Sequence, residues 1–188
     1  MNLLIMSVLC CGTGIAAFCD LKTGRIPNLL TFPMMLIGVA YHTSSAGLQG
    51  LGFSSGGLLL GIAILLVLYL IGGMGAGDAK LLGAVGSMVG SKGVVIAAVF
   101  SMLLGFFYAL FILMMNLDYA RSLLRRLWTI IKTFLLTAQF VYLPPKCDEK
   151  QPTLRYALPI ALGTMGYVFL KITKSNVIQD FLGIPFSI

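Results

Sequence analysis

Long apolar stretches with few charges are the feature that most limits how this chain can fold. Residues 1–19 contain no charged side chain, and residues 51–71 form a second uncharged stretch of similar length. A helix needs about 20 mostly apolar residues to cross the hydrocarbon core of a bilayer. Both stretches are therefore typical of membrane-spanning helices.

The composition of the whole chain agrees with this interpretation. Of its 188 residues, 59% are hydrophobic and only 10% are charged, whereas about a quarter of a soluble domain is charged. This balance excludes a disordered chain, a nucleic-acid-binding domain and an ordinary cytosolic enzyme. We therefore predict an all-α polytopic membrane protein, a single domain over residues 1–188 with about six transmembrane helices. The predicted spans are residues 1–19, 26–41, 51–71, 79–91, 93–117 and 156–170.

The Lys and Arg side chains predict the orientation of these spans, because cytoplasmic loops are enriched in both residues. If both termini lie outside, ten of the 13 cations fall on the cytoplasmic side and three on the other side. The ten are Lys22, Arg25, Lys80, Arg121, Arg125, Arg126, Lys132, Lys146, Lys150 and Arg155, and the three are Lys92, Lys171 and Lys174. We therefore expect both termini outside, with Asp20 and Asp78 on the cytoplasmic side.

A basic loop at residues 118–155 contains a predicted amphipathic helix at residues 120–142. Apolar side chains such as Leu123 and Leu127 recur at helical spacing, and cations such as Arg125 fall on the other face. This pattern is typical of a helix that lies in the membrane interface and binds anionic membrane lipid. Contact with a substrate is the alternative.

Cysteine and histidine give no sign of a metal site. The four cysteines are Cys10, Cys11, Cys19 and Cys147, and the one histidine is His42. They do not have the spacing of a zinc or haem site. The sequence therefore predicts no metal and no cofactor.

Asp20 directly follows the first apolar stretch, at the predicted C-terminal end of a helix. The helix dipole disfavours a carboxylate at that end, where Lys, Arg or Gly would be more stabilising. An ionisable group at membrane depth is a functional candidate by default. The structural alternatives are an interfacial side chain in water or an ion pair with Lys22 or Arg25.

Asp78 lies in a glycine-rich break, GGMGAGDAK, before a short predicted helix. Asp is a favoured helix N-cap, which is the structural alternative to a functional role. The short helix carries a stripe of small residues, which lets helices approach closely in lipid; its members are Ala79, Gly83, Gly86, Ser87 and Gly90. We expect this helix to pack tightly against a neighbour, for which the first helix is a candidate.

Two carboxylates on one side of the membrane suggest an aspartyl dyad. Like charges held close do not both ionise readily, so such a pair holds one proton between its members. The ionised member can then take a proton from water while the protonated member donates to a scissile carbonyl. From the residues alone, an intramembrane aspartyl peptidase and an ion or proton carrier that uses the same carboxylates as relay groups both stay open.

Three segments resemble the type IV prepilin peptidases. The segment from Asp20 through Arg25, Ile26, Pro27 and Asn28 resembles their D-x(4)-R-I-P-N motif. The segment Gly75-Ala-Gly77-Asp78-Ala-Lys80-Leu resembles their G-x-G-D-x-K-L motif, and residues 156–163 resemble the start of their last helix. A carrier needs neither of the first two motifs at these places. A catalytically idle scaffold protein of a pilus assembly platform is a third possibility, which the presence of both aspartates disfavours.

The resemblance implies an aspartyl endopeptidase of the bacterial inner membrane. Its partners would be prepilins or pilin-like precursors, which carry a short basic leader and an apolar helix and are cleaved at the cytoplasmic face. It implies that Asp20 and Asp78 are catalytic and that Gly75 and Gly77 are the motif glycines. Supporting roles follow for the remaining motif residues, which are Arg25, Pro27, Asn28 and Lys80.

One departure from the long members of the family affects the expected activity. Those members carry an N-terminal region with paired C-x-x-C motifs and a second, N-methylating activity. This sequence contains no such pair. We therefore expect a peptidase without methyltransferase activity, similar to the short peptidases of Flp/Tad-type pili and less closely to the archaeal preflagellin peptidases.

Overall fold

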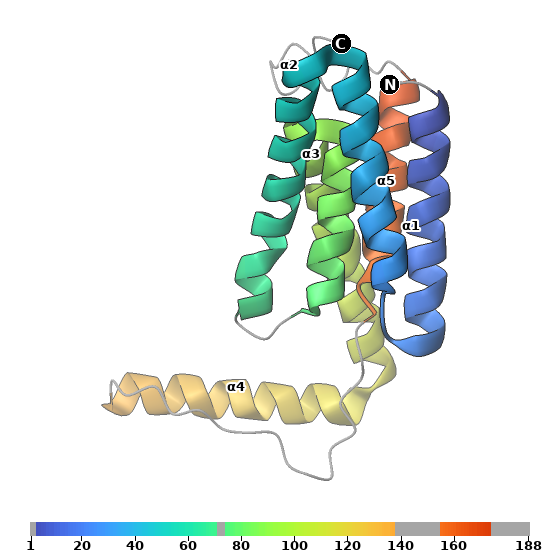
Figure 1. The fold of residues 1–188 in the computed structure, drawn as a ribbon. Helices are drawn as coiled ribbons and strands as arrows, with labels where there is room; N and C mark the ends of the chain where they lie inside the picture. Colours follow the sequence, from blue (N-terminus) through green and yellow to red (C-terminus); the bar gives the residue numbers. More distant parts are fainter. Residues whose placement is uncertain (1–2, 71–73, 138–154, 174–188) are drawn as a thin grey trace. The chain divides into compact units, whose positions relative to one another are not determined.

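The computed structural model describes residues 3–70, 74–137 and 155–173 of the chain. These residues contain five α-helices. The helices are α1 (Leu3–Thr23), α2 (Asn28–Leu70), α3 (Ala76–Met115), α4 (Leu117–Thr137) and α5 (Ala157–Ile172) (Figure 1). The predicted all-α class is confirmed for these residues. Three helices, α1, α2 and α3, are long and apolar enough to cross a membrane, and α5 is a shorter apolar helix.

The chain divides into two compact units. The first contains residues 1–105 and the chain from residue 155 onward, and the second contains residues 106–154. Thus α1, α2, α5 and most of α3 form one helical bundle, while α4 belongs to the second unit.

Both long helices of the bundle are broken at a glycine. The backbone of α2 leaves helical geometry at Ala46 and at Gly47, whose φ is 58°, and α3 is broken at Gly90, whose φ is 76°. Glycine enters this left-handed region without the steric cost that a side chain would add. The two halves of α2 consequently run in opposite directions (Figure 1). Between the predicted spans 26–41 and 51–71, only Ala46 and Gly47 are therefore non-helical.

The break at Gly90 leaves backbone carbonyl groups near a helix end without partners in α3. Side chains of α2 supply hydrogen-bond partners for two of them. The Ser54 hydroxyl donates a hydrogen bond to the Ser87 carbonyl over 2.7 Å. The Nε2 atom of His42 lies 2.9 Å from the Met88 carbonyl oxygen. Carbonyls in the last turn of a helix lack partners within that helix, so these contacts stabilise the break in an apolar environment.

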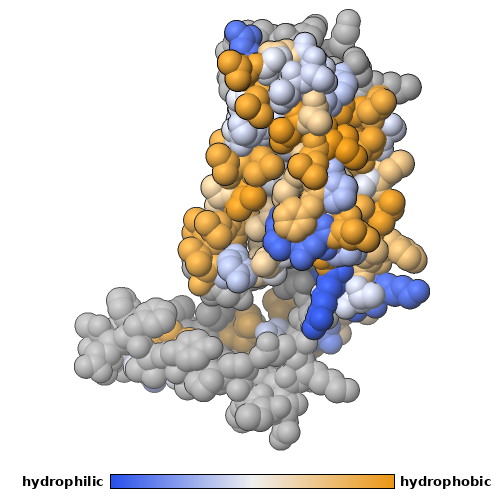
Figure 2. All heavy atoms as spheres, in the orientation of Figure 1, coloured by the Kyte–Doolittle hydropathy of each residue, from blue (hydrophilic) through white to orange (hydrophobic). Residues whose placement is uncertain are grey.

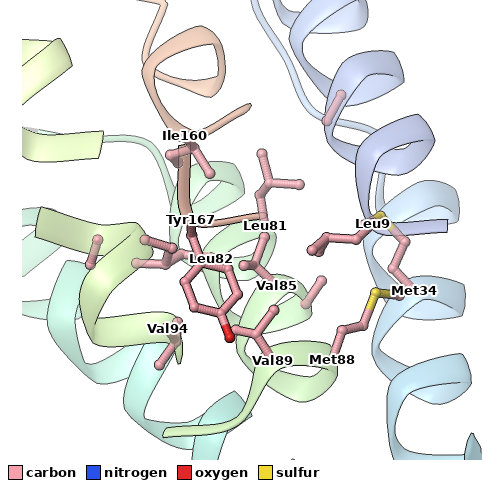
Figure 3. Packing of buried hydrophobic residues seen from close by; sticks show 14 of the residues in the cluster. Leu9, Met34, Leu81, Leu82, Val85, Met88, Val89, Val94, Ile160 and Tyr167 are labelled. Carbon is pink, nitrogen blue, oxygen red and sulfur yellow. The ribbon is translucent and has the colours of Figure 1, made fainter. Parts of the chain in front are cut away.

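The first half of α3 is the centre of the bundle. Every residue from 81 to 90 is buried. Figure 3 shows Val85 between Leu9 and Met34 on one side and Ile160 of α5 on the other. Three neighbouring helices thus cover this half of α3.

The stripe of small residues on α3 packs closely against α2 and not, as the sequence suggested, against the first helix. A Cβ atom added at Gly86 would lie only 2.1 Å from the carbonyl oxygen of Gly57. One added at Gly61 would lie 2.5 Å from the Leu82 carbonyl oxygen. The backbones of the two helices therefore touch, which is the contact that drives helix association where lipid removes the hydrophobic gain.

The outer surface of the bundle is apolar. Figure 2 shows apolar side chains over most of the visible face, with hydrophilic side chains gathered mainly towards one end. Large apolar side chains are exposed on every helix of the bundle, among them Phe18, Leu29, Leu36, Leu59 and Phe169. Such a surface is suited to lipid and agrees with a membrane location.

Helix α4 covers most of the amphipathic helix predicted at residues 120–142, whose last five residues lie outside the described part of the chain. Leu124 and Trp128 are exposed apolar side chains. Arg125 and Lys132 are exposed cations at other helical positions. The described side chains thus agree with the expected division of α4 into an apolar and a basic face.

Candidate active site

Asp20 lies in the last turn of α1 and is buried, with only 7% of its surface exposed. The helix continues past the predicted end at residue 19 to Thr23, whose hydroxyl donates a hydrogen bond to the Cys19 carbonyl. It ends where Gly24, at φ 65°, donates its N–H to the Asp20 carbonyl over 2.8 Å. A left-handed glycine after the last turn is a common helix terminator. Asp20 is therefore held inside the bundle and is not a free interfacial side chain.

Asp78 is half-buried in the first turn of α3. The helix already begins at Ala76, so Asp78 is not its N-cap residue. Its backbone N–H donates a hydrogen bond to the Gly75 carbonyl over 3.2 Å. The positive end of the helix dipole favours a carboxylate at this position.

The two motif glycines, Gly75 and Gly77, lie at places where a side chain would crowd a neighbouring residue. A Cβ atom at Gly75 would lie 3.4 Å from Oδ2 of Asp78. One at Gly77 would lie 3.3 Å from Cβ of Ile26, in the loop that follows α1. The start of α3 thus packs directly on the loop between α1 and α2, and the two sequence motifs meet there.

The fold brings Asp20 and Asp78 close enough for their carboxyl groups to interact electrostatically. They come from the end of α1 and the start of α3. A pair of neighbouring carboxylates can act as a general base and a general acid on a bound substrate and water. No group of three or more side chains suited to a metal ion occurs in the described part of the chain.

Lys80 connects the start of α3 to the start of α2. Its Nζ atom donates a hydrogen bond to Oδ1 of Asn28 over 3.0 Å. The same ammonium group lies over the ring of Phe32, 5.5 Å from the centroid. Lys80 and Asn28, which belong to different motifs, are thus direct partners.

Arg25 and Pro27 lie in the loop between α1 and α2, with exposed side chains. The Arg25 carbonyl accepts a hydrogen bond from the Thr23 hydroxyl over 3.1 Å. The Pro27 carbonyl accepts the N–H groups of Leu30 and Thr31 at the start of α2. Both residues therefore shape the loop through their backbones.

The start of α5 contributes residues to this site that the sequence analysis did not single out. Nη1 of Arg155 donates a hydrogen bond to the Asp20 carbonyl over 2.7 Å. The N–H of Ala157 donates to Oδ2 of Asp20 over 3.3 Å. Arg155 was counted only as a cytoplasmic cation. The resemblance of residues 156–163 to a family motif was the one signal that pointed to this segment.

Tyr156 lies between these two donors and reaches α3. Its hydroxyl donates a hydrogen bond to the Ser101 carbonyl over 3.3 Å. Its ring fills the space beside Gly105, where an added Cβ atom would lie 2.5 Å from Cε2. Burial and the negative charge of Asp78 both raise the pKa of the Tyr156 hydroxyl. The turn before α5 is therefore close to both aspartates.

A comparison with protein families decides which group of proteins this chain represents. The family model of the type IV leader peptidase family matches residues 7–110, more than half of the chain. The chain belongs to the type IV leader peptidase family. No curated protein and no solved structure matches it.

Membership in the type IV leader peptidase family implies a prepilin peptidase-type function, carried out by an aspartic peptidase. It also implies prepilin substrates and is consistent with the membrane location that the three long apolar helices indicate. The matched residues include Asp20, Asp78 and the motif residues around them. The start of α5 lies outside the match.

Proposed function

We propose that this leader peptidase is a membrane-embedded aspartyl endopeptidase with Asp20 and Asp78 as its catalytic pair. Its substrates are type IV prepilins or pilin-like precursors, cleaved at the cytoplasmic membrane face. The observation that carries the proposal is that the buried Asp20, at the end of α1, and the half-buried Asp78, at the start of α3, lie close enough to interact electrostatically. Family membership supports the reaction class.

The reaction needs one water and one shared proton. The ionised aspartate takes a proton from water, and the oxygen of that water bonds to the scissile carbonyl carbon. The other aspartate gives its proton to the carbonyl oxygen, which forms a neutral tetrahedral diol. Collapse of the diol breaks the C–N bond. The aspartate that took a proton from water gives it to the leaving nitrogen, and a diol hydroxyl gives its proton to the other aspartate as the new C=O forms, which restores the shared proton of the dyad. General acid–base catalysis of this kind contributes about 10²–10⁴-fold to the rate.

The motif residues around the dyad have supporting roles in this proposal. Gly75 leaves space beside the Asp78 carboxylate, and Gly77 lets the two motif loops touch. The hydrogen bond from Lys80 to Asn28 ties the start of α3 to the start of α2. Arg25 and Pro27 shape the loop that carries the first motif.

We further propose six membrane spans, with both termini outside the cytoplasm. The breaks at Gly47 and Gly90 support this layout, because they divide α2 and α3 into two halves each. Residues 76–89 extend only about 21 Å at 1.5 Å per residue, which is less than the hydrocarbon core of about 30 Å. Asp78 would then lie near the cytoplasmic interface or deeper in the membrane. In the same layout, α4 lies on the cytoplasmic leaflet and binds anionic lipid.

The finer class of the enzyme is also a proposal. The chain has no C-x-x-C pair, and we expect leader cleavage without N-methylation, as in the short peptidases of Flp/Tad-type pili. Incubation with a cleaved pilin and a methyl donor tests this point. A methylated N-terminus would contradict it.

Cleavage assays in proteoliposomes test the dyad. The substrate is a precursor with a basic leader, a glycine at the cleavage position and an apolar helix. Asp20→Asn and Asp78→Asn should each lower the cleavage rate at least about 10²-fold, whereas Asp118→Asn, the same change in α4, should not. Full activity in either of the first two variants would reject the dyad. Proton flux that depends on both aspartates, with an uncleaved precursor, would favour the ion or proton carrier instead.

A further inference from the structure

We propose that the turn leading into α5 is a positioning element for the catalytic pair, with Arg155 and the backbone amide of Ala157 as the donors that hold Asp20. The inference rests on the proposed function, because it assigns a role at the same two aspartates. It extends that function to residues outside both catalytic motifs and outside residues 7–110.

Asp20 is held at two points by this turn. Nη1 of Arg155 binds its backbone carbonyl, and the N–H of Ala157 binds its side chain at Oδ2. The first contact fixes the backbone at the end of α1, and the second fixes the rotation of the carboxyl group. Because the amide engages Oδ2, the second carboxylate oxygen is left for water.

The electrostatics of the two helix ends favour this arrangement. Asp20 lies at the C-terminal end of α1, where the helix dipole opposes a carboxylate. The guanidinium of Arg155 places a positive charge at that end, and Ala157 is the first residue of α5, where N–H groups attract anions. Both effects favour the orientation of the Asp20 carboxylate towards α5.

The same turn is anchored to the second half of α3, beyond the break at Gly90. Tyr156 donates its hydroxyl to the Ser101 carbonyl of α3, and its ring packs at Gly105 without a side chain between them. Tyr156 also lies within the electrostatic reach of Asp78. The turn therefore links the end of α1 to the second half of α3 and lies near Asp78, so it positions Asp20 beside that carboxylate. Geometry of this kind matters because a misplacement of about 1 Å at a reacting group can cost about 10²-fold in rate.

Kinetics of Arg155 variants separate a positioning role from a merely structural one. Arg155→Ala should lower kcat by up to about 10²-fold, the cost of a misplacement of about 1 Å at a reacting group, with KM for the precursor unchanged. Arg155→Lys should recover most of kcat, because an ammonium can still donate to the carbonyl. Lys22→Ala removes an exposed cation two residues from Asp20 and should leave both constants unchanged. Wild-type kcat in Arg155→Ala, or no recovery in Arg155→Lys, would overturn the proposal.

A second measurement is independent of activity. In the full chain labelled with [15N]alanine in nanodiscs, the Ala157 resonance is assigned by its loss in Ala157→Gly. Asp20→Asn weakens the acceptor and should move the Ala157 amide proton upfield, while Lys22→Ala should not move it. An unchanged resonance in Asp20→Asn would overturn the proposal. If Asp20→Asn shifts the resonance but the wild-type protein does not cleave the precursor, the proposed function is rejected while the contact between Asp20 and Ala157 is established.

Discussion

Lys80 donates a hydrogen bond to Asn28 across 3.0 Å, and this bond joins the two sequence motifs of the family directly. Lys80 follows Asp78 by two positions in α3, and Asn28 is the first residue of α2. The starts of both helices are therefore tied together beside the proposed catalytic pair.

A double-mutant cycle tests this tie. Lys80→Ala and Asn28→Ala should each lower the free energy of unfolding by up to about 1.5 kcal/mol, the usual net value of a hydrogen bond. The double variant should lose less than the sum, because each single change already removes the shared contact. Unfolding is followed in mild detergent, and Lys92→Ala supplies an exposed cation on the same helix as the control. Fully additive losses would show that the two side chains act independently.

Close packing of α2 on α3 predicts opposite effects at two adjacent glycines. Gly57→Ala should destabilise the bundle by about 1–3 kcal/mol, because the new methyl group would meet the Gly86 carbonyl at 2.1 Å. Gly56→Ala should be neutral or stabilising by up to about 1 kcal/mol, since nothing lies within 4 Å of its added Cβ atom. Thermal unfolding of the two variants is the measurement. Equal effects at both positions would contradict the packing.

The break at Gly90 makes Ser54 important for stability. Ser54→Ala leaves the Ser87 carbonyl without its hydroxyl donor and should cost about 1–3 kcal/mol. Ser55→Ala is the matched control, because the Ser55 hydroxyl bonds only to carbonyls of its own helix. A comparison of unfolding midpoints decides the point. If Ser54→Ala and Ser55→Ala behaved alike, the contact across the break would not matter for stability.

Tyr156 predicts a specific pH dependence at the alkaline end. Its hydroxyl has a raised pKa in the folded protein because of burial and the charge of Asp78, whereas an unfolded tyrosine titrates near pH 10. The resulting contribution to stability is present in full below about pH 10 and is lost as the pH rises through the folded pKa. Tyr156→Phe should therefore lose stability less steeply above about pH 10 than the wild type. Parallel pH profiles of the free energy of unfolding would contradict this assignment.

The proposed place of α4 on the membrane can be read from the one tryptophan of the chain, Trp128. Its side chain is 70% exposed in the structure. In bilayers that contain anionic lipid, its fluorescence should be quenched most by bromines near the headgroup end of the acyl chain. Neutralising Arg125 and Lys132 together should weaken that quenching in anionic bilayers. Emission typical of tryptophan in water, without quenching, would place α4 away from the lipid.

The sequence predicted the all-helical class, and it singled out the two aspartates as candidates, because those signals are local. Apolar length reveals a helix, and glycines mark where its backbone can break, as at Gly47 and Gly90. The motifs around Asp20 and Asp78 can likewise be read within about ten residues each.

Contacts between distant segments could not be predicted in this way. The contact between Arg155 and Asp20 joins residues at opposite ends of the sequence, and the topology rule accounted for Arg155 only as a cytoplasmic charge. A stripe of small residues shows that a helix approaches a neighbour closely, but Gly86 does not show whether that neighbour is α1 or α2. The end of α1 depended on the hydrogen bonds of Thr23 and Gly24, which charge patterning does not reveal.

The place of α5 in the bundle has a consequence for biosynthesis. The ribosome makes Asp20 and Asp78 early. Arg155 and Ala157, which hold Asp20, are made only after α4. During translation Asp20 is therefore made well before the turn that holds it. The surroundings of Asp20 in a nascent leader peptidase consequently stay incomplete until the start of α5 has been made.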